Sequence, residues 1–189
     1  MVPGVESVDN RLEVKWWLAD QSDDWDDGWT DADMERAIKE SLAIDPRVSA
    51  FDIVVDVFDG IASLSGTVEN LQAKRAAETR AADTLGVWYV RNNIRVRPEE
   101  EPTDADMAKD IRQSLQEDPY VDRYEIAVQV YDGQAYLYGN VDSAFMKRRA
   151  ELLASAVPGV FSVRNRLAVD ESLAKKSDEE IHKDIEQQL

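Results

Sequence analysis

The chain has 189 residues and a formal net charge of −17, from 39 acidic and 22 basic residues. Such an acidic surface repels nucleic acid phosphates, so we expect no nucleic acid partner, and it disfavours an anionic membrane. The absence of cysteine excludes disulfides and thiolate metal sites, and a single histidine, His182, excludes a His-rich metal site. No apolar run reaches membrane-spanning length, and the first residues lack the basic-then-apolar pattern of a signal peptide.

The chain contains one pattern twice. Residues 30–97 align with 103–170 at a constant offset and without a gap, and nearly half of the aligned pairs are identical. We therefore predict two complete domains, repeat 1 (residues 30–98) and repeat 2 (residues 103–170).

Each repeat is predicted to open with a helix. An N-cap Thr with an acid three residues later satisfies free amides at a helix start, and both repeats carry this pair at their first residues (Thr30 and Asp33; Thr103 and Asp106). Apolar residues at helical spacing follow (Met34, Ile38 and Leu42; Met107, Ile111 and Leu115). An Asp-Pro pair at 45–46 and 118–119 ends each helix, because the residue before proline avoids helical backbone angles.

A hairpin follows at 51–68 and at 124–141. Apolar residues alternate along both of its strands, and an Asp-Gly pair between them suits a type I′ turn, whose two central residues need positive φ. We expect Gly66 and Gly139 to lie on the inward face, beneath a helix, and to tolerate substitution poorly.

A second helix is predicted at 71–84 and 144–156, with N-caps Asn70 and Ser143, and with Gly86 and Gly159 as left-handed C-caps. A third strand follows at 87–96 and 160–169, with Asn92 and Asn165 among the inward residues, where they are expected to bond the nearby backbone. This order predicts an α+β fold of two tandem αββαβ sandwiches, each a small mixed sheet with two helices on one face.

Both ends of the chain resemble parts of a repeat. Residues 2–14 match the third strand, so 1–29 is interpreted as a partial repeat strand followed by a Trp- and Asp-rich linker. Residues 177–189 match the first helix, and 176–189 is interpreted as a partial repeat. We expect both partial repeats to be ordered by packing on a complete repeat, either in the same chain or head-to-tail in a second copy.

Taken together, these motifs resemble the BON domain family of bacterial modules, found in osmotically inducible periplasmic proteins. The similarity rests on the Asp-Pro after the first helix, on Asp-Gly-x-Ala-x-Leu-x-Gly-x-Val in the hairpin, and on Gly-Val-x-x-Val-x-Asn at 86–92 and 159–165. The resemblance implies a non-catalytic protein of the envelope, the periplasm or the exterior. It also implies either anionic phospholipid binding or a role in tethering and assembly.

Aromatic residues are the candidate partner contacts. Four tryptophans lie in the linker, and three tyrosines lie on the outward side of the second hairpin (Trp16, Trp17, Trp25 and Trp29; Tyr131, Tyr136 and Tyr138). Tryptophans that pack on a neighbouring repeat, and tyrosines that stabilise cross-strand pairs, are the alternative explanations. The aspartates between 20 and 27 offer oxygen ligands for calcium, but their spacing fails the EF-hand pattern, and we predict no metal and no cofactor.

The sequence shows no nucleophile beside a base and no phosphate-binding glycine loop, so we predict no enzymatic activity. The leading hypothesis is an interaction module of the bacterial envelope or exterior that binds a protein partner or associates with itself. The alternatives are a structural subunit that assembles head-to-tail into a ring or filament through its partial repeats, and a phospholipid-binding protein.

Overall fold

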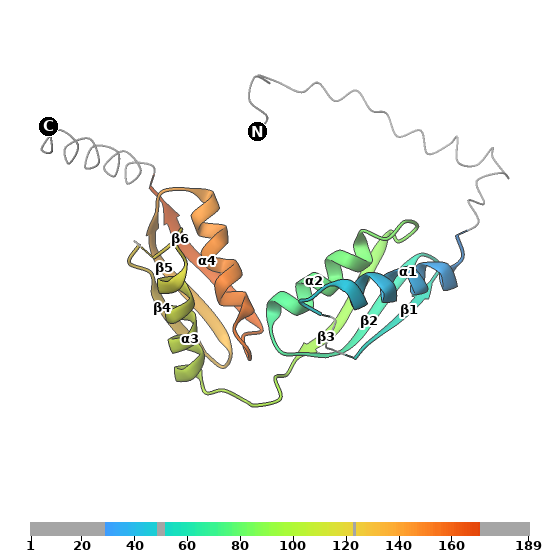
Figure 1. Cartoon of the computed structure of the whole chain (residues 1–189), viewed down its shortest axis with the longest axis horizontal. Helices are drawn as coiled ribbons and strands as arrows, with labels where there is room; N and C mark the ends of the chain where they lie inside the picture. The colour runs from blue at the N-terminus through green and yellow to red at the C-terminus, as the bar shows by residue number, and fades with distance from the viewer. Residues whose placement is uncertain (1–28, 49–51, 123, 171–189) are drawn as a thin grey trace, which may run out of the picture. The chain divides into compact units, whose positions relative to one another are not determined.

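The computed structural model describes residues 29–48, 52–122 and 124–170, and within them each repeat folds as helix, strand, strand, helix, strand (Figure 1). Repeat 1 contains α1 (Asp31–Ile44), β1 (Ile53–Phe58), β2 (Ile61–Val68), α2 (Leu71–Ala82) and β3 (Tyr89–Val96). Repeat 2 contains α3 (Asp104–Glu117), β4 (Ala127–Tyr131), β5 (Gln134–Val141), α4 (Ala144–Ala156) and β6 (Ser162–Val169). The partial repeats predicted at 1–29 and 176–189 lie outside the described residues, apart from Trp29.

Each repeat has its own three-stranded mixed sheet. The strand orders are β1-β2-β3 and β4-β5-β6, with an antiparallel hairpin and a parallel third strand in both. The two helices of each repeat lie side by side on one face of its sheet (Figure 1). The predicted α+β fold of two αββαβ sandwiches is confirmed.

The buried residues form two separate cores, one in each repeat. The apolar stripe of the first helix is buried as predicted, and Ile38 and its equivalent Ile111 are both 0% exposed. Facing them, Leu64 and Leu137 at the centre of each sheet are also fully buried. Each repeat therefore buries its own apolar face between a helix layer and a sheet, which is the arrangement that the alternation predicted.

The Asp-Gly turns have the predicted type I′ geometry. Asp59 and Gly60 have φ of 49° and 68°, and Asp132 and Gly133 have φ of 45° and 70°. The turn fixes the register of each hairpin, so the residues on either side of it pair directly, as in Tyr131 with Gln134.

The predicted C-caps of the second helices were wrong. Gly86 and Gly159 do have positive φ, but α2 ends at Ala82 and α4 at Ala156, so each glycine lies in the turn beyond the helix rather than at its C-cap. Val169 pairs with the buried Val141, so alternation places it on the inward side, but it is 43% exposed at the end of β6.

Gly66 and Gly139 lie at the predicted inward positions of the central strands, in alternation with buried residues, and nearby backbone constrains both. A Cβ at Gly66 would lie 2.5 Å from the carbonyl oxygen of Asp52, and one at Gly139 would lie 2.5 Å from that of Glu125. Their φ values of 133° and 139° are also ones that L residues rarely adopt. The nearest obstacle is thus the backbone that leads into the neighbouring strand, which the sequence pattern did not indicate.

Candidate functional site

In repeat 2 the helices cover one face of the sheet, and the other face is open to solvent. Strand alternation and register identify its outward residues, which we call the open face of repeat 2: Ala127, Gln129 and Tyr131 on β4; Gln134, Tyr136, Tyr138 and Asn140 on β5; Ser162, Arg164, Arg166 and Ala168 on β6. The central strand buries Ala135 and Leu137 between these positions, which confirms the alternation.

The three tyrosines predicted as candidate contacts lie on this face. Tyr131 is 73% exposed, Tyr138 is 37% exposed, and Tyr136 is half-buried. The rings of Tyr136 and Tyr138 are nearly parallel, with centroids 6.5 Å apart and an interplanar angle of 5°. Together with Gln129 and Val130 the tyrosines line a shallow hollow of about 480 Å³. Across the hairpin, Tyr136 pairs with Gln129 and Tyr138 pairs with Ala127.

Hydrogen bonds hold the centre of the open face in place. The Tyr136 hydroxyl donates to Oε1 of Gln134, and the side-chain amide nitrogen of Gln134 (Nε2) donates to the Ser162 hydroxyl at 3.1 Å. Tyr136 is therefore fixed by its neighbours, whereas the hydroxyl of the more exposed Tyr131 has no hydrogen bond within the described part of the chain. A partly fixed aromatic surface loses little side-chain entropy when it binds a partner.

The equivalent face of repeat 1 is different in chemistry. Ser63 and Ser65 stand where repeat 2 has Tyr136 and Tyr138. This face also carries Asp56, whereas the outward positions of β4, β5 and β6 include no carboxylate. Only Phe58 matches an aromatic of repeat 2, at the position of Tyr131. Repeat 1 has other aromatics at outward positions, Phe58 and Tyr89, which are 77% and 53% exposed, so only the cluster of three tyrosines is specific to repeat 2.

Arg164 and Arg166 lie on β6 beside the tyrosines. The parallel register pairs Arg164 with Tyr136 and Arg166 with Tyr138, so each arginine forms a row with a tyrosine across the sheet. Both arginines are exposed, and neither forms an ion pair with a described residue. The open face of repeat 2 therefore carries two cations and no anion in a chain whose net charge is −17.

A buried ion pair fixes the two helices behind this sheet. Asp118, the Asp of the second Asp-Pro pair, is 5% exposed and accepts hydrogen bonds from Arg149 of α4 at 2.6 and 2.8 Å. Hydrogen bonding to Arg149 holds the pKa of the Asp118 carboxyl below its ordinary value, against the opposing effect of burial. The guanidinium carbon of Arg149 also lies 5.9 Å from the ring centroid of Tyr120, so both Asp118 and this ring contact the guanidinium group.

Repeat 1 makes the same link with different residues. Asp45 is 2% exposed and binds Arg47 at 2.6 and 2.9 Å and Arg80 of α2 at 2.8 Å. The hydrogen bonds from Arg47, helped by the one from Arg80, hold the pKa of Asp45 well below its ordinary value although burial opposes them. The Asp of each Asp-Pro pair thus joins the end of the first helix to the second helix.

The inward asparagines bond the backbone, as predicted. Asn165 donates to the Lys147 carbonyl of α4 at 2.8 Å and accepts from the Leu167 amide at 3.2 Å. Asn92 does the same with the Lys74 carbonyl and the Ile94 amide, both at 3.1 Å. Each asparagine ties a helix to the third strand, which is a structural role.

The first acidic residue of each repeat holds the hairpin turn. Asp104 accepts the Asp132 amide at 2.8 Å and the Gly133 amide at 2.9 Å. In repeat 1, Asp31 accepts the equivalent amides of residues 59 and 60 at 2.9 and 3.1 Å. A carboxylate at the start of a helix therefore satisfies both free amides of a turn that is distant in sequence, and this clamp fixes the orientation of the hairpin.

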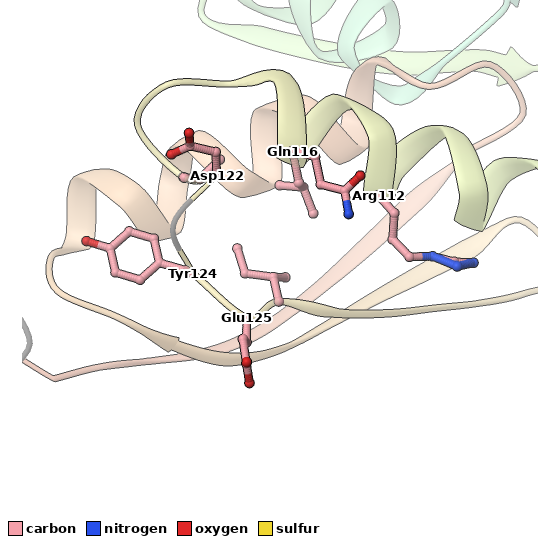
Figure 2. Close-up of a pocket in the computed structure, with 8 residues that line it drawn as sticks. Arg112, Gln116, Asp122, Tyr124 and Glu125 are labelled. Atoms are coloured by element: carbon pink, nitrogen blue, oxygen red, sulfur yellow. The ribbon is translucent and has the colours of Figure 1, made fainter.

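A second hollow of repeat 2 lies between α3 and the segment before β4, and its volume is about 280 Å³ (Figure 2). Arg112 and Gln116 extend from α3 on one side, and Tyr124 and Glu125 come from the segment before β4. The lining contains no serine, cysteine or histidine, and Arg112 Nε already donates to a carbonyl of its own helix. This hollow therefore lacks the paired groups that nucleophilic catalysis needs.

Of the predicted tryptophan contacts, only Trp29 is described, and it is 39% exposed just before α1. Trp16, Trp17 and Trp25 lie outside the described residues, as do the aspartates between 20 and 27 and His182. Within the described ranges, no group of three or more His, Cys, Asp or Glu side chains could hold a metal ion. Also within those ranges, no helix is both long and apolar enough to cross a membrane.

Sequence reasoning missed Arg164, Arg166 and the two buried ion pairs. The arginines could have been found, because the alternation that identified inward residues of the third strand also places them outward. Alignment of the repeats does not match Arg149 with Arg80, because their positions in the second helix differ by one helical turn. The equivalent of Arg149 in repeat 1 is Ala76, which no pattern would connect with Asp45.

Comparison with known proteins identifies the family. A model of the BON domain matches residues 30–98 and 103–171. Osmotically-inducible protein Y of Escherichia coli (strain K12) is 31% identical over 143 residues, which cover 72% of this chain and 71% of that protein.

Two solved structures of CdsD, a structural protein of the type III secretion system of Chlamydia trachomatis, are also similar. Both are 14% identical to this chain with a TM-score of 0.31, and the matches cover 75% and 79% of this chain and 68% and 69% of theirs. Likeness at this level supports no statement about function. The family match spans both repeats and the relative exceeds 30% identity over most of its length, so this chain belongs to the BON domain family.

Proposed function

We propose that this chain is a non-enzymatic interaction protein of the bacterial envelope or exterior, and that it binds a protein partner through the open face of repeat 2. The observation that carries the proposal is the concentration of Tyr131, Tyr136 and Tyr138 on one solvent-facing side of a sheet. Tyrosines supply a large contact area together with a polar group, and they are enriched at protein interfaces.

The comparison between the repeats supports this role. Cross-strand stabilisation alone would explain isolated aromatics in either hairpin, but repeat 1 has the same strand order with Ser63 and Ser65 in place of two of the tyrosines. The fold therefore does not need these aromatic rings, and a binding role accounts for their cost in exposed apolar surface. The family and the osmotically inducible relative support a location in the envelope or exterior.

Photo-crosslinking in the full chain tests the proposal. A photoreactive phenylalanine at Tyr131 or Tyr138, in cells exporting the protein, should give a discrete protein adduct that mass spectrometry identifies. The matched positions in repeat 1, Phe58 and Ser65, should give little adduct. Equal adduct yields at matched positions of the two repeats would overturn the assignment to repeat 2.

A head-to-tail structural subunit is the second candidate. It is favoured by the match of residues 2–14 to the third strand of repeat 2, and by the position of β6 at one edge of its sheet. Light scattering of the purified chain separates the two candidates. Mass that rises with protein concentration, together with crosslinks only between copies, supports assembly, whereas a monomer that crosslinks to another protein supports the first proposal.

A further inference from the structure

We propose that the open face of repeat 2 recognises an extended acidic segment of a partner protein, with carboxylates at alternate positions. The inference rests on the proposed function, because it names the class of partner for the same face. It is carried by the charge of the face, by the spacing of its two arginines, and by the tyrosine beside each of them.

The charge of this face is opposite to that of the chain. Its outward positions contain Arg164 and Arg166 and no carboxylate, although acidic residues outnumber basic ones by 39 to 22 in the whole sequence. Neither arginine is neutralised by an ion pair within the described residues. Exposed arginines without partners, beside aromatic side chains, suit a ligand that brings its own carboxylates.

The spacing of the arginines indicates the form of the ligand. Arg164 and Arg166 are two residues apart on β6, so they project from the same side of the sheet about 6.6 Å apart. An extended peptide repeats its side chains at the same spacing, so acids at alternate positions would meet both guanidinium groups. Tyr136 and Tyr138, in register with the arginines, add aromatic contact area for the side chains of the ligand.

The size of the charged area favours a peptide over a membrane or a nucleic acid. A bilayer or a duplex is an extended polyanion, and its negative charge would reach beyond the two arginines to other parts of a chain whose net charge is −17, with screening only beyond a Debye length of about 8 Å. A single extended segment contacts only the open face, where the two cations lie. Binding should therefore weaken with salt, as expected for exposed ion pairs, while the tyrosine contacts persist.

Fluorescence anisotropy of the full chain with a labelled synthetic peptide tests the inference. The probe carries aspartates alternating with valines, and the control peptide has the same composition with its aspartates and valines in separate blocks. We expect the alternating peptide to bind more tightly than the block peptide. The double variant Arg164→Gln/Arg166→Gln should weaken binding by about tenfold, since two exposed ion pairs are worth somewhat under 1 kcal/mol each.

Arg91→Gln/Arg95→Gln removes the outward arginines of β3 in repeat 1 and is the matched control, which should change affinity less than twofold. Equal losses in both double variants, or equal binding of both peptides, would indicate unspecific charge attraction and overturn the inference. Binding to phosphatidylglycerol vesicles that depends on Arg164 and Arg166, without peptide binding, would indicate a lipid and overturn it as well.

The chain itself contains an acidic aromatic segment, residues 16–29, that could compete with the probe. A variant with its five aspartates changed to asparagine removes that competitor. If the alternating peptide binds only to this variant, the occupant of the open face is the chain's own segment, and the partner-protein assignment fails. If the peptide binds neither to the parent chain nor to this variant, the inference about acidic segments is wrong. The proposed interaction role is tested separately, by the crosslinks at Tyr131 and Tyr138.

Discussion

Replacing Arg149 by leucine should destabilise repeat 2, because it leaves the buried Asp118 carboxylate without a cation among the described residues. The Asp118 side chain is 4% exposed and loses hydrogen bonds of 2.6 and 2.8 Å, but it keeps the Tyr120 amide at 3.1 Å. Breaking one side of a buried ion pair costs about 3–5 kcal/mol. The Arg149 side chain is itself 40% exposed, so we expect the lower end, about 3 kcal/mol.

Repeat 1 supplies the matched control. Arg80→Leu removes the helix-two partner of Asp45, but Arg47 still binds that carboxylate at 2.6 and 2.9 Å. The free energy of unfolding should therefore fall by only about 1 kcal/mol, which is a typical contribution of one hydrogen bond from a partly exposed partner. Arg148→Leu, at the exposed neighbour of Arg149, should stay within about 0.5 kcal/mol.

Urea denaturation followed by far-UV circular dichroism measures these free energies, and hydrogen exchange in α3 and α4 assigns the loss to repeat 2. The pH dependence is a second readout. In the parent protein the pKa of Asp118 is depressed, so its stabilisation is present above the ordinary carboxyl pKa of about 3.9 and is lost on acidification. Without Arg149 the largest cause of the low pKa is gone, while burial still raises the Asp118 pKa and the backbone amides of Tyr120 and Val121 still lower it. The Asp118 pKa should therefore rise, and the difference in stability between the parent and the variant should narrow as the pH falls. Equal costs for Arg149→Leu and Arg80→Leu, or a gap that is constant with pH, would refute this reasoning.

Three further predictions concern the backbone and the acidic residues. Gly139→Ala should lower the free energy of unfolding by about 2 kcal/mol, because φ is 139° and a Cβ would meet a carbonyl oxygen at 2.5 Å; an unchanged Tm would contradict this. Asp104→Ala should cost about 1–2 kcal/mol and speed hydrogen exchange at Gly133, whose amide it binds at 2.9 Å; unaltered exchange would show that the clamp is unimportant. Asp45→Asn should make the free energy of unfolding fall less steeply below about pH 4, because the depressed pKa of Asp45 means that its stabilisation is lost on acidification. Urea titrations at several pH values that show the same fall in both proteins would contradict this.

The elements of each repeat could be predicted because their signals are local. The Asp-Gly turn fixes the hairpin register by itself, so the inward residues Val55, Leu64 and Leu137 followed directly from alternation. Helix starts followed from capping residues such as Asn70, which accepts the Ala73 amide at 2.9 Å as expected. The end of a helix depends less on a single residue than its start does. Gly86 has a positive φ, but it lies in the turn after α2 and does not mark the end of the helix.

The side-chain links between distant elements could not be predicted in the same way. The Asp-Pro motif predicted a helix end, but nothing local indicates that Asp118 is buried or that α4 supplies its cation. The partner is also at a different turn of the second helix in each repeat, so comparison of the repeats hides the link. Alternation alone places the tyrosines and the arginines outward, whereas the pairing of each arginine with a particular tyrosine needed the register of the parallel third strand.

The carboxylate that holds each hairpin turn also bears on the chemical ageing of the protein. An Asp-Gly pair decays when the glycine nitrogen attacks the aspartate side chain, closes a succinimide ring with loss of water, and reopens as isoaspartate. That attack requires the glycine amide to give up its proton, and here the Gly60 and Gly133 amides donate theirs to Asp31 and Asp104 at 3.1 and 2.9 Å. We therefore expect isoaspartate to accumulate at residue 132 faster in Asp104→Ala than in the parent chain during warm storage, with residue 59 as the internal reference; peptide mapping that shows equal rates at residue 132 in both proteins would rule this protection out.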